Sequence, residues 1–315
     1  MTSALRRRTS ADTGPDALAP SPDAPAPAPA PGGPADRGTL RRLLRRPRFF
    51  LPLSAVVLLC AMAAVPSAFA GWFGHGDPHQ CSLAHSGQGP TAGHPFGYDV
   101  QGCDLYSNVI HGARDSLSIG LLTTALTLVV AVVLGSVAGY FGGLLDLLVS
   151  RLMDVFFGFP MLVGMIVVLE TFSVHSILSV SLVLALFSWP VLTRIMRSSV
   201  LAVRGLDYVT AARELGAGPL RIVLRHAVPN AIMPVAVLTS INIGGVITAE
   251  ASLTFLGVGL TAPAISWGVQ LNTAQQYFTT HPGLLLFPAL FLSLAVLSFV
   301  LLGDCLRDAF DPRLR

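Results

Sequence analysis

Six long apolar segments constrain this sequence more than any other feature. Hydrophobic residues make up 52% of the 315-residue chain, and charged residues only 12%. A soluble domain usually carries about twice that charged fraction. Because a helix of about 20 apolar residues is needed to cross a bilayer, we predict an all-α integral membrane protein with about six transmembrane helices. The predicted spans cover residues 49–70, 117–140, 155–169 with its flanks, 177–195, 232–249 and 284–302.

The arginines predict the direction in which the chain crosses the membrane. All 20 basic residues are arginines, and with the N-terminus inside the cell only Arg114 lies on the outer side. Basic residues collect on the cytoplasmic side of membrane proteins. This distribution predicts that the N- and C-termini are both cytoplasmic.

The absence of lysine bears on the activity of the chain. The usual ATP-binding P-loop requires a lysine after its glycines, and this sequence contains none. We therefore expect no ATP site in this chain. We also expect no enzyme, because the acids are isolated and the histidines are scattered rather than grouped as an active site requires. The histidines between 75 and 94 match the spacing of no closed zinc site. No catalytic residue, metal site or nucleic-acid partner is predicted.

The segments outside the spans differ in composition. Residues 1–48 are rich in alanine, proline and arginine. Such a segment cannot bury a core, so we predict a disordered cytoplasmic tail whose basic part is attracted to anionic membrane lipid. The end of the first span, 67–70, is similar to a signal-peptidase site, and cleavage there is an open alternative. We expect a polar extracytoplasmic segment over 71–115, the membrane core over 116–305, and a cytoplasmic C-terminus over 306–315.

An arginine-rich loop, 204–229, is the longest polar interruption in the C-terminal two-thirds of the chain. Apolar residues recur in it at helical spacing, which predicts a short helix over 206–215. Gly216 can end this helix, because glycine tolerates the left-handed conformation of a helix end. Pro219 can open a second helix, which we predict to end at Pro229.

Two interpretations of this loop are open from the residues alone. In the first, it is an ordinary basic cytoplasmic loop that only fixes the topology. In the second, it is a docking helix for a partner protein. Ala211 and Ala212 favour the second interpretation, because they leave one face of the helix bare enough for close approach.

The loop also resembles a known signature. The order Ala211-Ala212, then Gly216, then HAVPN at 226–230 is similar to that of binding-protein-dependent ABC importer permeases. The resemblance implies the type I ABC importer permease (MetI-like) fold, in which this loop is the coupling helix held in a cleft of the ATP-hydrolysing subunit. The family pattern begins with glutamate where this chain has Thr210. The residues implied in coupling are Tyr208, Ala211, Ala212, Arg213, Glu214, Leu215, Gly216, Arg221, His226 and Pro229.

Further motifs resemble the C-type permease subunit of dipeptide and oligopeptide importers. They cover residues 94–104, 112–117, 250–259 and 302–313. The resemblance implies a permease of the bacterial cytoplasmic membrane that translocates peptides. Its implied partners are a second homologous permease, two subunits that bind ATP and Mg²⁺, and an extracytoplasmic substrate-binding protein. The alternatives are an importer of nickel or other metal chelates and, less favoured, an ion-driven secondary carrier.

Three residues outside the loop are candidates for other roles. Cys81 and Cys103 both fall in the extracytoplasmic segment, where an oxidising compartment favours a disulfide; the alternative is two free thiols. Glu250 is an acid near the outer end of a span, where an ionisable group is costly. It either lines or gates the transport path, or it is a structural acid that is hydrogen-bonded through Ser252 or Thr254.

Overall fold

The computed structural model describes residues 47–74, 76–172 and 175–310. All of them fall within one compact unit. The predicted disordered tail therefore lies almost wholly outside the described residues. The described part consists of helices joined by turns, with isolated β-bridges between residues 81 and 104. The prediction of an all-α protein is confirmed for this part of the chain.

The six predicted spans are helical for most of their length, with interruptions at Val65 in the first and at Phe159-Pro160 in the third. The α-helices are α2 (Pro47–Ala64), α3 (Pro66–Ala70), α4 (Leu105–Phe141), α5 (Gly143–Gly158), α6 (Met161–Phe172), α7 (Ile177–Arg204), α8 (Asp207–Glu214), α9 (Pro219–Ile222), α10 (Val228–Phe255), α11 (Trp267–Ala274) and α12 (Gly283–Phe310). A 3₁₀ turn, η1 (Leu83–His85), and a π-helical segment, η2 (Val223–Ala227), complete the described part. Within it, four helices are long and apolar enough to cross a membrane, or five if the bent pair α5–α6 forms one span. α2 is a shorter apolar helix.

The second span begins earlier than the sequence predicted. α4 starts at Leu105 rather than at Leu117, and the side chain of Asp104 caps it by accepting a hydrogen bond from the backbone N–H of Tyr106 at 3.2 Å. Hydropathy detects the apolar part of a helix. The first turns of α4 contain polar residues, among them Ser116, which is buried where its hydroxyl accepts from the backbone N–H of Trp267 at the start of α11, so these turns carry little hydropathy signal.

The third span differs from the predicted helix. The predicted span over 155–169 is divided between α5, which begins at Gly143, and α6, which follows α5 at an angle of 90°. The break falls at Phe159, whose backbone is extended with φ −91° and ψ 135°. A residue before proline is pushed out of the helical conformation, and Pro160 therefore explains why the chain bends here.

The prediction that a helix ends at Pro229 is wrong. α9, η2 and α10 follow one another without a break from Pro219 to Phe255. Pro229 lies in the first turn of α10, where a missing N–H costs little. The fifth span therefore runs past the predicted end at Ala249. α7 also continues through its internal Pro190 to Arg204.

The most extensive helix pair of the described part is α4 with α7. Two glycines of α4 make this close packing possible. A methyl group added at Gly135 would lie 2.7 Å from Cβ of Met196, and one at Gly139 would lie 2.9 Å from Cβ of Val200. Both distances are shorter than real packing allows. The inner halves of these helices are thus held together by a contact that only glycine permits.

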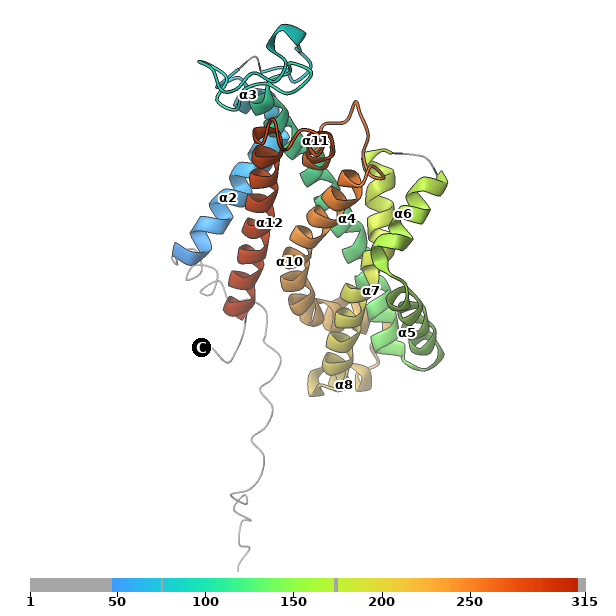
Figure 1. Ribbon diagram of the computed structural model, residues 1–315. Helices are drawn as coiled ribbons and strands as arrows, with labels where there is room; N and C mark the ends of the chain where they lie inside the picture. Colours follow the sequence, from blue (N-terminus) through green and yellow to red (C-terminus); the bar gives the residue numbers. More distant parts are fainter. Residues whose placement is uncertain (1–46, 75, 173–174, 311–315) are drawn as a thin grey trace, which may run out of the picture. The chain divides into compact units, whose positions relative to one another are not determined.

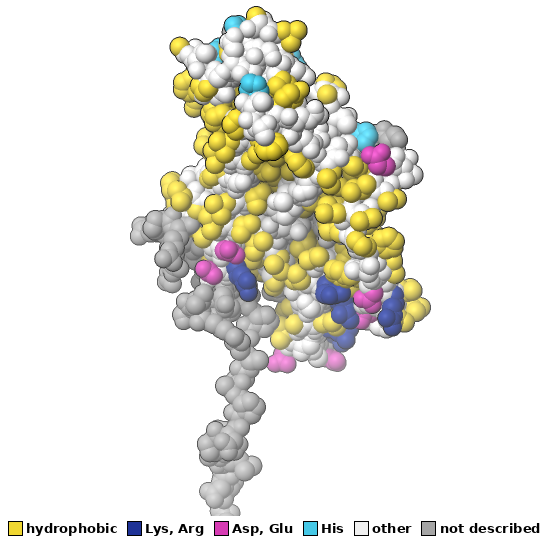
Figure 2. Space-filling model, viewed as in Figure 1, with side chains coloured by type: hydrophobic (Ala, Val, Ile, Leu, Met, Phe, Trp, Pro, Cys, Tyr) yellow, Lys and Arg dark blue, Asp and Glu magenta, His cyan; other side chains and the backbone are white. Residues whose placement is uncertain are grey.

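The bundle has two chemically different ends. Figure 1 shows α8 at one end and α3 and α11 at the opposite end. On the face in Figure 2, arginine and acidic side chains gather at the end that holds α8, histidines gather at the other end, and a hydrophobic band lies between them. This distribution agrees with the topology that the arginines predicted, with the loop 204–229 on the cytoplasmic side.

Candidate functional site

The loop 204–229 folds into a short helix followed by a sharp turn. α8 covers Asp207–Glu214, close to the predicted 206–215. An acid such as Asp207 in the first turn is favourable, because the N-terminus of a helix carries partial positive charge. After α8, Gly216 adopts a φ of 82°, and the backbone N–H of Ala217 donates back to Ala212 at 3.0 Å. The glycine therefore ends the helix in the way that the sequence predicted.

One apolar side chain fastens α8 to the rest of the protein. Val209 is fully buried and belongs to a cluster with residues of α7, α9 and η2. Its partners include Val203 at the end of α7 and Ile222 in α9. Since hydrophobic burial is non-directional, this contact holds α8 against the bases of two spans without fixing one angle. α8 therefore contacts α7 directly and is connected to α10 through α9 and η2, which continue into α10.

The opposite side of the loop presents exposed apolar residues. Leu215 is 88% exposed, and Leu220 and Leu224 are also exposed. Ala211 is exposed, whereas Ala212 is half-buried. Exposed leucines within an arginine-rich loop form a surface that suits a partner protein.

The remaining residues implied in coupling lie around this surface. Arg213, Glu214 and Arg221 are exposed. The rings of Tyr208 and His226 approach each other, with centroids 6.5 Å apart. Burial raises the pKa of the Tyr208 phenol, which therefore stays neutral near pH 7. The structure thus brings residues of α8 together with His226 of η2.

Two arginines of α7 that the sequence analysis missed anchor the start of the loop. Arg197 binds Asp146 of α5 through two hydrogen bonds, one of them 2.7 Å between Nη2 and Oδ2. Nη1 of Arg204 donates to the carbonyl of Tyr140 at 2.9 Å and to that of Gly139 at 3.3 Å. Carbonyls in the last turn of a helix lack helical donors, so Arg204 caps α4. No local pattern indicates these pairings, because the partners are 51 to 65 residues apart in the sequence.

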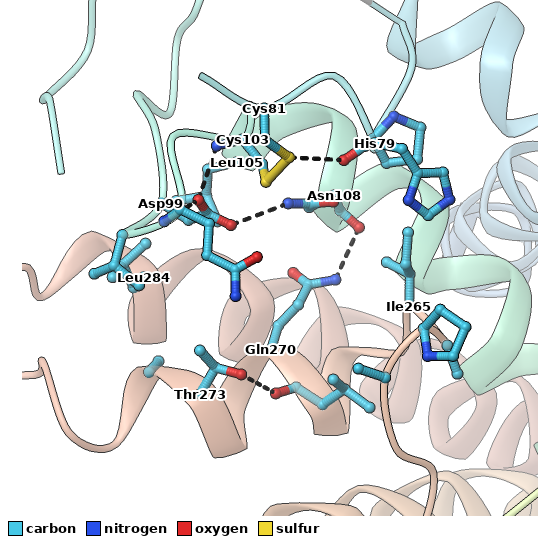
Figure 3. A pocket seen from close by; sticks show the side chains of 18 residues that line it. His79, Cys81, Asp99, Cys103, Leu105, Asn108, Ile265, Gln270, Thr273 and Leu284 are labelled. Carbon is cyan, nitrogen blue, oxygen red and sulfur yellow. Dashed lines mark hydrogen bonds between the residues drawn. A yellow bond between two sulfur atoms is a disulfide. The ribbon is translucent and has the colours of Figure 1, made fainter. Parts of the chain in front are cut away.

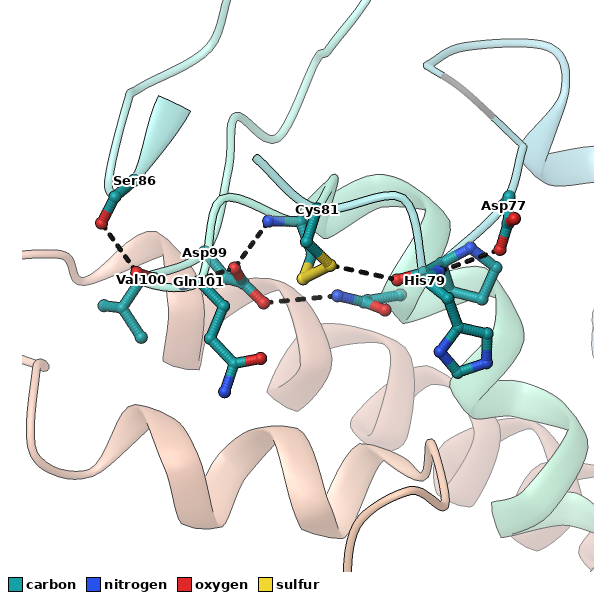
Figure 4. Close-up of a disulfide and its surroundings, with 10 residues drawn as sticks. Asp77, His79, Cys81, Ser86, Asp99, Val100 and Gln101 are labelled. Atoms are coloured by element: carbon teal, nitrogen blue, oxygen red, sulfur yellow. Dashed lines mark hydrogen bonds between the residues drawn. A yellow bond between two sulfur atoms is a disulfide. The ribbon is translucent and has the colours of Figure 1, made fainter. Parts of the chain in front are cut away.

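Cys81 and Cys103 are joined by a disulfide. The bridge closes a segment that contains η1 and ends just before α4. Inside this segment, Oδ1 of Asp99 accepts hydrogen bonds from the backbone N–H groups of Gln101 and Cys103, both at 2.8 Å. The bridge and the carboxylate therefore hold the same turn, which Figure 4 shows from close by.

Glu250 lies inside the bundle. It is fully buried, and its Oε1 accepts hydrogen bonds from Thr254 at 2.9 Å and from Ser266 at 3.3 Å. Ser252 donates instead to the carbonyl of Thr248. This arrangement agrees with the structural interpretation through Thr254 and not through Ser252. Glu250 is fully enclosed by the chain in this conformation, and its role in lining or gating the path stays a prediction.

Comparison with known proteins gives consistent matches. Residues 131–315 match the family described as "Binding-protein-dependent transport system inner membrane component". The chain is 35% identical over 228 residues to the dipeptide transport system permease protein DppC of Alkalihalophilus pseudofirmus. This match covers 72% of this chain and 75% of that protein. It is 36% identical over 228 residues to the glutathione transport system permease protein GsiD of Pectobacterium atrosepticum, with the same coverage of 72% and 75%.

A longer match and a solved structure complete the comparison. The chain is 36% identical over 277 residues to a protein of Brucella suis biovar 1 named as a peptide transport system permease protein, covering 88% of this chain and 92% of that one. A solved amino acid ABC transporter with histidines has a TM-score of 0.48 and 17% identity, covering 62% of this chain and 91% of that chain.

Proposed function

This chain belongs to the family of binding-protein-dependent transport system inner membrane components, and we propose that it is the permease subunit of an ABC importer that takes up peptides. It is a multi-pass protein of the cytoplasmic membrane. Its relatives are named as dipeptide, glutathione and peptide transport permeases. These names support peptides as the cargo in preference to metal chelates.

The geometry of α8 is the observation that carries the proposal. The helix is packed through Val209 against α7 and α9, and exposed leucines follow it in the same loop, at Leu215, Leu220 and Leu224. A partner bound to those leucines can therefore move α7 and α10 without a flexible linker between them. Since the chain has no lysine for a P-loop, the force comes from partner subunits that bind ATP and Mg²⁺.

In this mechanism the chain performs no covalent chemistry. Two ATP-hydrolysing subunits dock on the coupling loops of this chain and of a homologous second permease. Closure of these subunits moves α8, and the spans attached to it rock so that the path opens outward. An extracytoplasmic binding protein then delivers the peptide. A path that contacts only peptide main chains can be weakly selective, so the binding protein supplies the selectivity.

Leu215→Glu tests the docking surface. The side chain is 88% exposed, so the substitution removes little packing within this chain. We expect the ATPase subunits to be lost during co-purification. We also expect peptide uptake to fall by about tenfold or more, as for the loss of an interface hot spot worth about 2 kcal/mol. Leu83→Glu is the matched control, since Leu83 is 80% exposed in the outer segment and its replacement should leave both measurements unchanged.

Gly216→Pro tests the turn behind the docking surface. Proline fixes φ near −65°, whereas Gly216 has a φ of 82°. We expect transport to be abolished while membrane insertion is retained, which fractionation of the membranes would measure. Normal uptake by Gly216→Pro, or normal co-purification with Leu215→Glu, would refute the role of α8 in coupling.

A further inference from the structure

A cavity of about 260 Å³ lies at the outer end of the bundle. Its walls come from the disulfide-linked segment, from the start of α4, and from α11 with the turn before it (Figure 3). Most small-molecule sites measure roughly 300–1,000 Å³. The cavity is therefore the right size for one residue or one side chain, and too small for a whole peptide.

Asp99 supplies a carboxylate oxygen with spare hydrogen-bonding capacity. Its Oδ1 is occupied by the two backbone N–H groups of the turn. Its Oδ2 accepts one hydrogen bond from Nδ2 of Asn108, and the distance is 3.5 Å. That contact is longer than a usual N–H···O hydrogen bond, which measures about 2.7–3.2 Å between the heavy atoms. Oδ2 can therefore accept a stronger donor.

Gln270 supplies a second acceptor, from α11. Its Nε2 donates to the backbone carbonyl of Asn108 at 2.8 Å, which fixes the amide beside the cavity. Its Oε1 is buried and has no hydrogen-bond partner among the described residues. A buried acceptor without a donor is costly and requires an explanation. Figure 3 shows that Asp99 and Gln270 are both hydrogen-bonded to Asn108.

The cavity holds one carboxylate, that of Asp99, and the described residues that line it include no arginine. The imidazole of His79 is the other ionisable side chain in its wall. Desolvation by burial raises the pKa of Asp99 above its ordinary value, even though three backbone hydrogen bonds act to lower it. A positive group in the cavity would offset the energetic cost of this desolvation, because an opposite charge stabilises a carboxylate.

We propose that this cavity is a binding site for one ammonium or guanidinium group, held by Oδ2 of Asp99 and Oε1 of Gln270. The proposal deepens the proposed function and rests on it. In a peptide importer such a cation has two sources. It is either the amino-terminal end of the peptide cargo or a basic side chain of the docked binding protein.

Asp99→Asn is the variant that tests the site. The asparagine keeps Oδ1 for the backbone N–H groups of Gln101 and Cys103 and removes the charge at Oδ2. Asp77→Asn is the matched control, because Asp77 is an exposed acid of the same segment that also accepts from a backbone N–H, at 2.9 Å from His79, and lies outside the cavity. Thiol alkylation followed by mass spectrometry verifies that the disulfide still forms in both variants.

The first measurement uses the assembled complex in nanodiscs and its binding protein without peptide. If the cation belongs to the binding protein, Asp99→Asn should raise the dissociation constant of the binding protein from the complex about tenfold, which corresponds to about 1.4 kcal/mol. The salt dependence of binding should fall at the same time, because a charge pair is screened by salt. Asp77→Asn should behave as the wild type.

The second measurement uses alanyl-alanine and the ATPase activity that it stimulates in the same complex. If the cation is the amino end of the cargo, Asp99→Asn should raise the half-maximal peptide concentration about tenfold and leave the binding-protein affinity unchanged. Equal values for wild type, Asp77→Asn and Asp99→Asn in both measurements would overturn the cation site. A wild-type complex that no peptide stimulates would instead refute the proposed cargo, and the first measurement would still test the cavity.

Discussion

The outer end of the bundle and helix α8 at the inner end are held in place by different kinds of interaction. At the outer end, directional bonds join segments that are distant in the sequence: Trp267 alone binds Val109 and Ser116 of α4, and a disulfide closes the segment before α4. At the inner end, directional bonds from two arginines join α7 to α4 and α5, whereas α8 itself is fastened by the burial of Val209. Directional bonds fix one geometry, whereas apolar contacts tolerate sliding. We infer that the outer end is a fixed frame and that the inner loop is the part that moves.

The largest effect is expected from breaking the outer frame at Trp267. The side chain is fully buried, its Nε1 donates to the carbonyl of Val109 at 2.9 Å, and its backbone N–H donates to Oγ of Ser116 at 3.1 Å. Trp267→Ala should lower the free energy of unfolding by about 3–5 kcal/mol, measured by denaturant titration in detergent. Trp267→Phe keeps most of the packing and loses the N–H donor, so its loss should be smaller. Wild-type stability of Trp267→Ala would show that this contact does not hold the outer end.

A smaller effect, with a sharper location, is expected from opening the disulfide. Replacing Cys81 and Cys103 by serine should destabilise the protein by about 3 kcal/mol, the entropy expected for a loop of this order. Hydrogen exchange followed by mass spectrometry should show faster exchange between residues 81 and 104, and unchanged exchange in α8. Treatment of the wild type with a reductant is the matched comparison. Faster exchange in α8 as well would contradict the separation of the two ends.

The sequence predicted best what depends on neighbouring residues. Apolar length located the spans, and the glycine at 216 located the end of α8, since both signals are local. The resemblance to ABC importer permeases also predicted the helical fold and the permease family correctly. Pro160 was available to predict the bend between α5 and α6, but the apolar run over 155–169 hid the break.

What the sequence did not predict depends on contacts between distant segments. The hydrogen bond between Ser266 and Glu250 joins an outer turn to a span, and the cap that Arg204 places on α4 joins residues far apart in the chain. No local sequence pattern indicates the π-helical segment η2, and the sequence therefore predicts a helix end at Pro229 that the structure does not have. Only the packing of the whole bundle determines these features.

The smallest effect is expected at the inner end, from a pair of glycines that differ in backbone conformation alone. Gly216 has a φ of 82°, whereas Gly218 has a φ of −65°. A methyl group added at either position would meet nothing within 4 Å, so no clash separates them. Gly216→Ala should cost about 1–2 kcal/mol, because an L-residue is strained in the left-handed region.

Gly218→Ala should cost nothing or stabilise slightly, since alanine restricts the unfolded chain more than glycine does. Hydrogen exchange in α8 and peptide transport per ATP hydrolysed are the measurements. Gly216→Ala should fray α8 and lower the transport ratio, because a docked partner would then move a loosened helix instead of the spans. If both variants transported equally well, the turn at Gly216 would not transmit force, and the inner end would not be the moving part that its apolar attachment indicates.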